Sequence, residues 1–92
     1  MEISAYREAI DAIDDKLLAL LNERALLALK IGESKFRNRI LVQSSDREQA
    51  ILNRLIEKNT GPLQKQHIIE IFSTIIATSR NLQHLYQSYE DV

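Results

Sequence analysis

The chain has 92 residues, of which 45% are hydrophobic and 27% charged, a composition typical of one small globular domain and not of a disordered segment. Twelve basic residues against thirteen acidic ones give a net charge of −1, which argues against a nucleic-acid-binding protein. No apolar run is long enough to cross a membrane and the opening residues lack the pattern of a secretory signal, so we expect a single cytoplasmic domain, residues 1–92.

The composition favours helix almost throughout, because glycine and proline are scarce and leucine, isoleucine, alanine and glutamine abound. Apolar residues recur at helical spacing over residues 3–31, which predicts a long first helix. We expect Ser4 to cap its start, and its end to lie near Phe36 or Arg39. Gly32 costs a helix only about 1 kcal/mol and is not expected to end it. The alternative is a break at this glycine or earlier, which would fold the chain into a monomeric bundle.

A second helix is predicted after the polar residues 38–45. Ser45 and Glu48 have the spacing of a capping box, in which the two side chains bind the first free backbone N–H groups, so this helix should begin at Ser45. Residues 59–62, which include a glycine and a proline, should end it. The apolar spacing then predicts a third helix over residues 64–89. The expected fold is therefore all-α, with three helices.

The first helix should be too long for its own subunit. At 1.5 Å per residue it would measure about 50 Å, whereas a compact domain of this length has a diameter of roughly 30 Å. Its apolar stripe would project beyond the fold and remain exposed. Two copies that intertwine about a two-fold axis would cover each other's stripes. The sequence therefore predicts an obligate, intertwined homodimer.

Two cations of the first helix could hold an anion. Arg24 and Lys35 are 11 positions apart, which returns a helix to within about 20° of the same face. That face adjoins the apolar stripe, so both long side chains could lean towards a buried ligand. Arg7 lies 17 positions before Arg24, too far along the helix to reach the same ligand. In the intertwined dimer it would complete the partner subunit's pocket, although an arginine at such a position is more often a surface cation.

Further polar residues on the second and third helices could complete this pocket. Arg47 falls in the first turn of the second helix, where a bound anion would offset its unfavourable interaction with the helix dipole. Glu48 has the competing structural role of a cap. Ser79 and Gln83 lie one turn apart within the apolar stripe of the third helix. They could be satisfied inside the core or could offer neutral hydrogen bonds to a buried ligand.

The remaining inventory argues against a metal, a cofactor or a covalent intermediate. There is no cysteine, and His67 and His84 are 17 positions apart, so no metal site is expected. Two glycines in all cannot form a glycine-rich phosphate loop, and no nucleophile–base set is visible. These residues suit a small polyanion that reacts without a cofactor.

The segment from Arg7 to Arg24, REAIDAIDDKLLALLNER, closely resembles the opening helix of the all-α chorismate mutases. Later polar landmarks of that family follow at matching intervals: Lys35, Asp46-Arg47-Glu48, Ser79 and Gln83. The resemblance covers nearly the whole chain. It implies an intertwined dimer with two equivalent active sites that rearrange chorismate to prephenate, on the route to phenylalanine and tyrosine, without a cofactor.

The resemblance also implies roles for the residues that match. Arg24 and the partner's Arg7 would bind the two substrate carboxylates, since the guanidinium fork fits a carboxylate. Lys35 and Gln83 would donate hydrogen bonds to the ether oxygen, which gains negative charge as its bond to the ring breaks.

The same resemblance assigns the other end of the pocket. Glu48 would accept a hydrogen bond from the ring hydroxyl, Ser79 would assist with a carboxylate, and Arg47 would support that end of the site. Ser44 departs from the pattern, because the bacterial enzymes of the family carry an aspartate there. This change is mild if only the backbone meets the ligand, and it loosens the pocket if a side-chain charge organises Arg47.

Two alternatives remain open at this point. Isochorismate–pyruvate lyases resemble these mutases and share their Arg, Arg, Lys and Gln frame, but they usually lack the Arg47-Glu48 pair and the small hydroxyl of Ser79. A non-catalytic helical dimerisation module belongs to a different class. In such a module Arg24, Lys35 and Gln83 would be replaceable surface or core residues.

Overall fold

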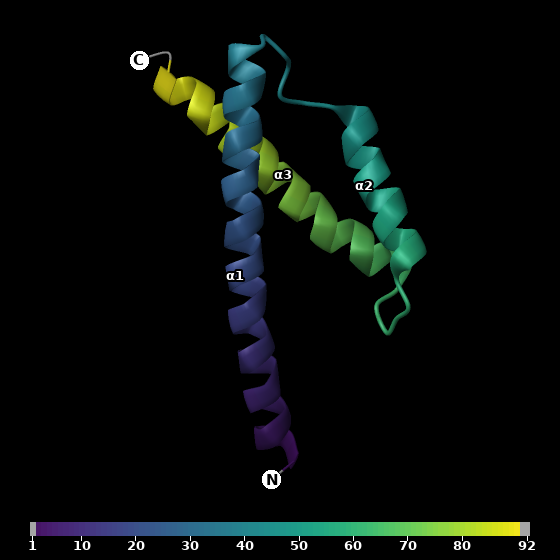
Figure 1. The fold of residues 1–92 in the computed structure, drawn as a ribbon. Coiled ribbons are helices and arrows are strands. Elements are labelled where there is room, and N and C mark those ends of the chain that lie inside the picture. Colours follow the sequence, from purple (N-terminus) through teal and green to yellow (C-terminus); the bar gives the residue numbers. More distant parts are fainter. Residues whose placement is uncertain (1, 91–92) are drawn as a thin grey trace.

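The computed structural model describes residues 2–90, with side chains for residues 2–85. It contains α1 (Glu2–Arg37), α2 (Ser45–Lys58) and α3 (Lys65–Glu90), and no strand is found in these residues (Figure 1). The predicted all-α fold with a long first helix is thus confirmed. Among the described helices, none is both long and apolar enough to pass through a membrane.

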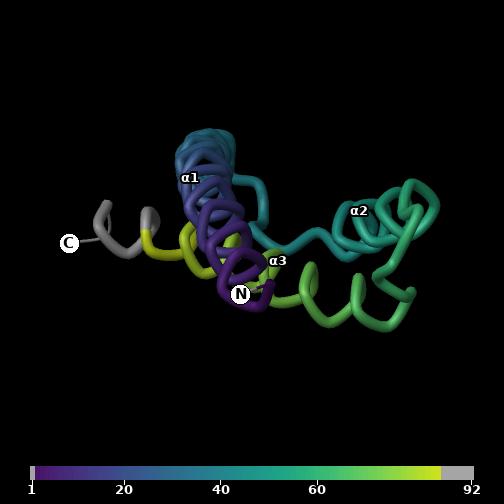
Figure 2. The backbone as a smooth tube through the Cα atoms, turned by 90° about the horizontal axis from the view of Figure 1, so that it is seen from below, coloured from purple at the N-terminus to yellow at the C-terminus, as the bar shows by residue number. Residues whose placement is uncertain are grey.

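The three helices form an open arrangement. α3 packs against both α1 and α2, whereas within residues 2–90 the helices α1 and α2 do not pack against each other. Figure 2 shows α2 standing apart from α1, with α3 extending from one to the other. A space between α1 and α2, with α3 as its floor, is therefore built into the fold.

α1 spans the full length of the molecule. Its 36 residues correspond to about 54 Å of helix, and the largest extent of the molecule is 55 Å. The radius of gyration is 16.5 Å, against about 12 Å for a compact domain of this size. The alternative of a break at Gly32 was wrong, because α1 continues through that residue. The prediction of Ser4 as the cap was also wrong, since α1 already includes Glu2.

The core of one subunit is small, and much of α1 lies outside it. Within residues 2–85 the buried apolar residues are Ala28, Val42, Ile51, Ile68 and Ile76. Along the first two thirds of α1 an apolar stripe is between 43% and 65% exposed, and it consists of Ile3, Tyr6, Ile10, Ile13, Leu17, Leu20 and Leu21. The apolar stripe therefore projects from the subunit as predicted. The homodimer that would cover it stays a prediction.

Gly32 sets the closest approach of α1 to α3. A Cβ atom added at this glycine would lie 2.8 Å from the Cα atom of Gln83 and 3.1 Å from its carbonyl oxygen. Both atoms belong to the backbone of α3, so neither can move aside without shifting the helix. Helix packing thus explains the glycine within α1. The lack of a side chain at Gly32 allows the backbone of Gln83 to lie directly against α1.

We expect Gly32→Ala to lower the free energy of unfolding by roughly 2 kcal/mol, because overpacking at the helix crossing outweighs the better helix propensity of alanine. Thermal unfolding followed by circular dichroism measures the change. Lys30→Ala is the control, since Lys30 is exposed on the same helix and makes no such contact. A Gly32→Ala protein at least as stable as the wild type would contradict the close approach.

Candidate active site

A cavity of about 250 Å³ lies between the three helices and the loop that joins α1 to α2. Seven of the eight residues predicted for the site line it: Arg24, Lys35, Ser44, Arg47, Glu48, Ser79 and Gln83. Apolar side chains form the rest of its wall, among them Leu27, Ile31, Ile51 and Ile76. Polar groups on an apolar wall are typical of small-molecule sites.

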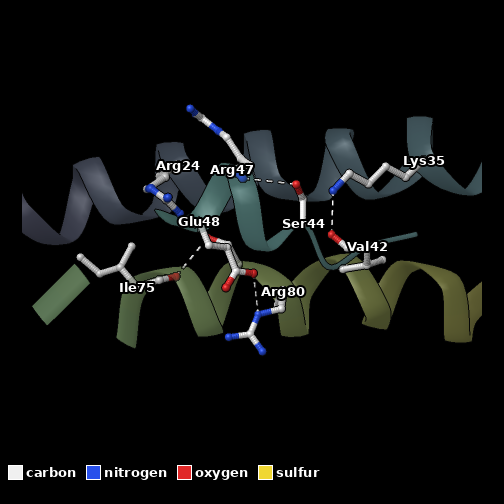
Figure 3. A network of polar contacts seen from close by, with 9 residues as sticks. Arg24, Lys35, Val42, Ser44, Arg47, Glu48, Ile75 and Arg80 are labelled. Carbon is white, nitrogen blue, oxygen red and sulfur yellow. Dashed lines mark hydrogen bonds and ion pairs between the residues drawn. The ribbon is translucent and has the colours of Figure 1, made fainter. Parts of the chain in front are cut away.

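Arg24 is anchored across the helix crossing. Its Nη1 atom donates a hydrogen bond to Ser79 Oγ on α3, and that hydroxyl donates in turn to the carbonyl oxygen of Ile75 at 3.1 Å (Figure 3). The serine therefore fixes the guanidinium at the cavity wall. A guanidinium has five N–H donors, so most of them remain for a ligand.

Lys35 is held at the other end of the cavity by the loop after α1. Its Nζ atom donates a hydrogen bond of 2.7 Å to the carbonyl oxygen of Val42, and Val42 is only 5% exposed. The ammonium group uses one of its three donors in this contact. Arg24 and Lys35 thus lie in one cavity, on the same side of α1, as their spacing predicted.

Gln83 presents a buried side-chain carbonyl oxygen without a partner. The residue is 8% exposed, and its Oε1 atom is buried without a hydrogen bond in the described part of the chain. An unsatisfied buried polar group costs about 1–3 kcal/mol. A ligand or a water that donates to Oε1 would remove this cost.

Glu48 does not act as a cap. Its Oε2 atom lies 2.9 Å from Nε of Arg80 on α3, so the predicted capping box was wrong. Arg80 also lines the cavity and was missed by the sequence analysis. A signal was present, because Arg80 lies three positions before Gln83 and residues at this spacing are neighbours on a helix surface.

Ser44, one residue before the predicted cap Ser45, is the N-cap of α2. Its backbone is extended, with φ −134° and ψ 97°, and its Oγ atom accepts a hydrogen bond of 3.3 Å from the backbone N–H of Arg47. The hydroxyl is therefore engaged in capping. The exposed guanidinium of Arg47 points away from Glu48 in Figure 3, at the rim of the cavity.

Arg7 is the one predicted site residue outside the cavity. It is exposed on the projecting part of α1, about 26 Å along the helix from Arg24. Within a single subunit it cannot meet the same ligand. Its role in the partner subunit's site remains a prediction.

The cavity is strongly cationic. Arg24, Lys35, Arg47 and Arg80 contribute four positive charges and Glu48 one negative charge, so these lining residues sum to +3. A ligand with two carboxylates complements that charge. The described residues contain no group of three or more histidine and acidic side chains placed to hold a metal ion.

Comparison with known proteins identifies the family. The sequence profile of the family "Chorismate mutase type II" matches residues 6–84. The chain is 42% identical over 76 residues to the bifunctional chorismate mutase/prephenate dehydratase of Escherichia coli strain K12. This alignment covers 82% of the present chain and 20% of that protein. The enzyme of the same name from Aquifex aeolicus is 33% identical over 86 residues, which covers 89% of this chain and 24% of that protein.

These alignments confirm the resemblance that the polar landmarks indicated. The chain spans between a fifth and a quarter of the length of these two relatives. The matched region includes α2, nearly all of α1 and the part of α3 that lines the cavity. By its sequence, the chain belongs to the chorismate mutase type II family.

Proposed function

We propose that this chain is a chorismate mutase, which catalyses the rearrangement of chorismate to prephenate. The observation that carries the proposal is the cationic cavity, which combines Arg24 and Lys35 with the buried side chain of Gln83. The reaction is a unimolecular pericyclic shift. The bond from the ether oxygen to the ring breaks as a carbon–carbon bond forms between the enolpyruvyl group and the ring, so no nucleophile, proton relay or cofactor is needed.

The first task of the cavity is to hold the substrate in its reactive conformation. Arg24 binds one carboxylate, and the partner's Arg7 binds the other. Fixing both ends brings the enolpyruvyl group over the ring, which removes the entropic cost of reaching that geometry in solution. Ser79 supports this step, since its hydroxyl positions the Arg24 guanidinium.

The second task is to stabilise the charge that develops on the ether oxygen. Lys35 and Gln83 donate hydrogen bonds to this atom. Both contacts strengthen as the carbon–oxygen bond breaks, so they lower the barrier more than they tighten substrate binding. The Val42 carbonyl that holds Lys35 fixes the ammonium group in advance.

The third group of residues binds the ring end of the substrate. Glu48 accepts a hydrogen bond from the ring hydroxyl, and Arg47 supports the same end from the rim. Ser44 contributes through the backbone at the start of α2, because its hydroxyl already caps the helix.

The working unit is a homodimer. The exposed apolar stripe of α1 supports this proposal, because a second copy would cover it. The position of Arg7 on the same projecting segment supports it too. Each of the two sites would then use one arginine from the neighbouring chain.

Incubation of the purified protein with chorismate, with no metal or cofactor added, tests the proposal. We expect the absorbance of chorismate to decline and prephenate to accumulate. A parallel incubation with isochorismate separates the lyase alternative. Salicylate and pyruvate from isochorismate, with no prephenate from chorismate, would overturn the assignment. The presence of Arg47, Glu48 and Ser79 in the cavity favours the mutase.

A further inference from the structure

The cavity contains a single carboxylate among its described lining residues, and that carboxylate is paired. Glu48 on α2 lies with Oε2 at 2.9 Å from Nε of Arg80 on α3, and the two side chains are 24% and 34% exposed. Figure 3 shows the Arg80 guanidinium on the side of Glu48 away from Arg24 and Lys35. Arg80 thus holds the carboxylate from the side opposite to the cations assigned to the substrate.

The geometry of this contact leaves Glu48 able to bind something else. The Nε atom of Arg80 makes no aligned hydrogen bond within the described residues, so the contact is a pairing of charges. Only one carboxylate oxygen takes part. A carboxylate has about four acceptor positions, and most of them remain for a donor from a ligand.

We propose that Arg80 is a positioning residue that keeps Glu48 from competing with the substrate, an inference that rests on the proposed function. Three other cations line the cavity, namely Arg24, Lys35 and Arg47. A carboxylate without Arg80 would turn towards them and occupy the donors that the substrate carboxylates require. Paired with Arg80, Glu48 stays on the α3 side and offers its free oxygen to the ring hydroxyl.

Two other roles for Arg80 give different results. As a structural link between α2 and α3, it would affect unfolding and not ligand affinity. Arg80 could also be one more cation that attracts a dianion through space. Its removal would then weaken binding by the same factor whether or not Glu48 carries a charge. The positioning role alone makes the effect of Arg80 depend on the Glu48 carboxylate, because only a charged Glu48 can compete.

A double-mutant cycle with Arg80→Met and Glu48→Gln tests the proposal. The affinity for prephenate is measured by calorimetric titration, so that variants with little turnover can be compared, and kcat and KM for chorismate are measured beside it. Arg80→Lys keeps the charge and serves as the conservative variant. Arg37→Met is the matched control, because Arg37 forms an exposed ion pair with Glu33 outside the cavity.

We expect Arg80→Met to weaken prephenate binding and to raise KM about tenfold, with a smaller change in kcat. In the Glu48→Gln background the same substitution should change affinity less than about twofold. The affinity of Arg80→Lys for prephenate should stay within about threefold of the wild-type value. The affinity of Arg37→Met should equal the wild-type value. Should Arg80→Met not fold, Arg80→Gln takes its place in the cycle with the same expectations.

Wild-type affinity in Arg80→Met, or an equal loss in both Glu48 backgrounds, would overturn the positioning role. Neither result would touch the proposed function, which depends on the conversion of chorismate by the wild-type protein. A wild-type protein that leaves chorismate unchanged would instead remove the basis of both.

Discussion

Lys35→Ala should lower kcat for chorismate about a thousandfold, the upper range for loss of one donor to a developing negative charge, with a much smaller change in KM. The ammonium group is placed in advance by its hydrogen bond to the Val42 carbonyl, and nothing in alanine replaces it. Loss of that hydrogen bond should reduce the free energy of unfolding by only about 1 kcal/mol. Steady-state kinetics together with thermal unfolding measure the two effects.

Lys30→Ala is the control for this experiment. It removes the same charge from an exposed position of α1, five residues before Lys35, outside the cavity. Its turnover should equal that of the wild type. Normal turnover in a folded Lys35→Ala protein would instead contradict the role assigned to Lys35. A folded wild-type protein without turnover would favour the non-catalytic dimerisation module.

Mixed dimers should recover activity that neither parent variant has. Arg7→Ala and Lys35→Ala homodimers each lack one essential group in both sites, so both should be nearly inactive. In a dimer with one chain of each kind, one site has its own Lys35 and an intact Arg7 from its neighbour. The other site lacks both. Isolated with two affinity tags, the mixed dimer should show about half of the wild-type activity, because one of two symmetric sites is complete.

A second mixed dimer provides the control. Arg24→Ala paired with Lys35→Ala leaves each site without one of its own residues, so it should remain inactive. If Arg7 served its own chain, the first mixed dimer would be as inactive as this one. A folded, monomeric wild-type protein in sedimentation would contradict the shared site directly.

The local spacing of apolar and polar residues was enough to predict the helices and the face of α1 that lines the cavity. The spacing of Arg24 and Lys35 depends only on the geometry of one unbroken helix, and α1 is unbroken. The same holds for Ser79 and Gln83 on α3. The space between α1 and α2 then follows from how α3 packs against each of them.

The capping box at the start of α2 was predicted wrongly because the side chain of Glu48 contacts a residue far away in the sequence. Ser45 and Glu48 satisfy the spacing of a capping box, yet the carboxylate pairs with Arg80, 32 positions later, and Ser44 caps the helix instead. With two serines in succession, the pattern could not decide which one is extended. The partner of Arg24 is even more distant in the sequence, since Ser79 follows it by 55 positions.

In the proposed homodimer, the small core of each subunit would make the free energy of folding depend on protein concentration. Among residues 2–85 only five apolar side chains are buried within one copy, so a folded state that consists of two chains would draw much of its stability from their association. By mass action, each tenfold dilution would then cost such a pair about 1.4 kcal/mol of folding free energy. Near the dissociation constant of such a dimer, halving the number of chains would more than halve the number of assembled sites, so activity would fall faster than the amount of polypeptide.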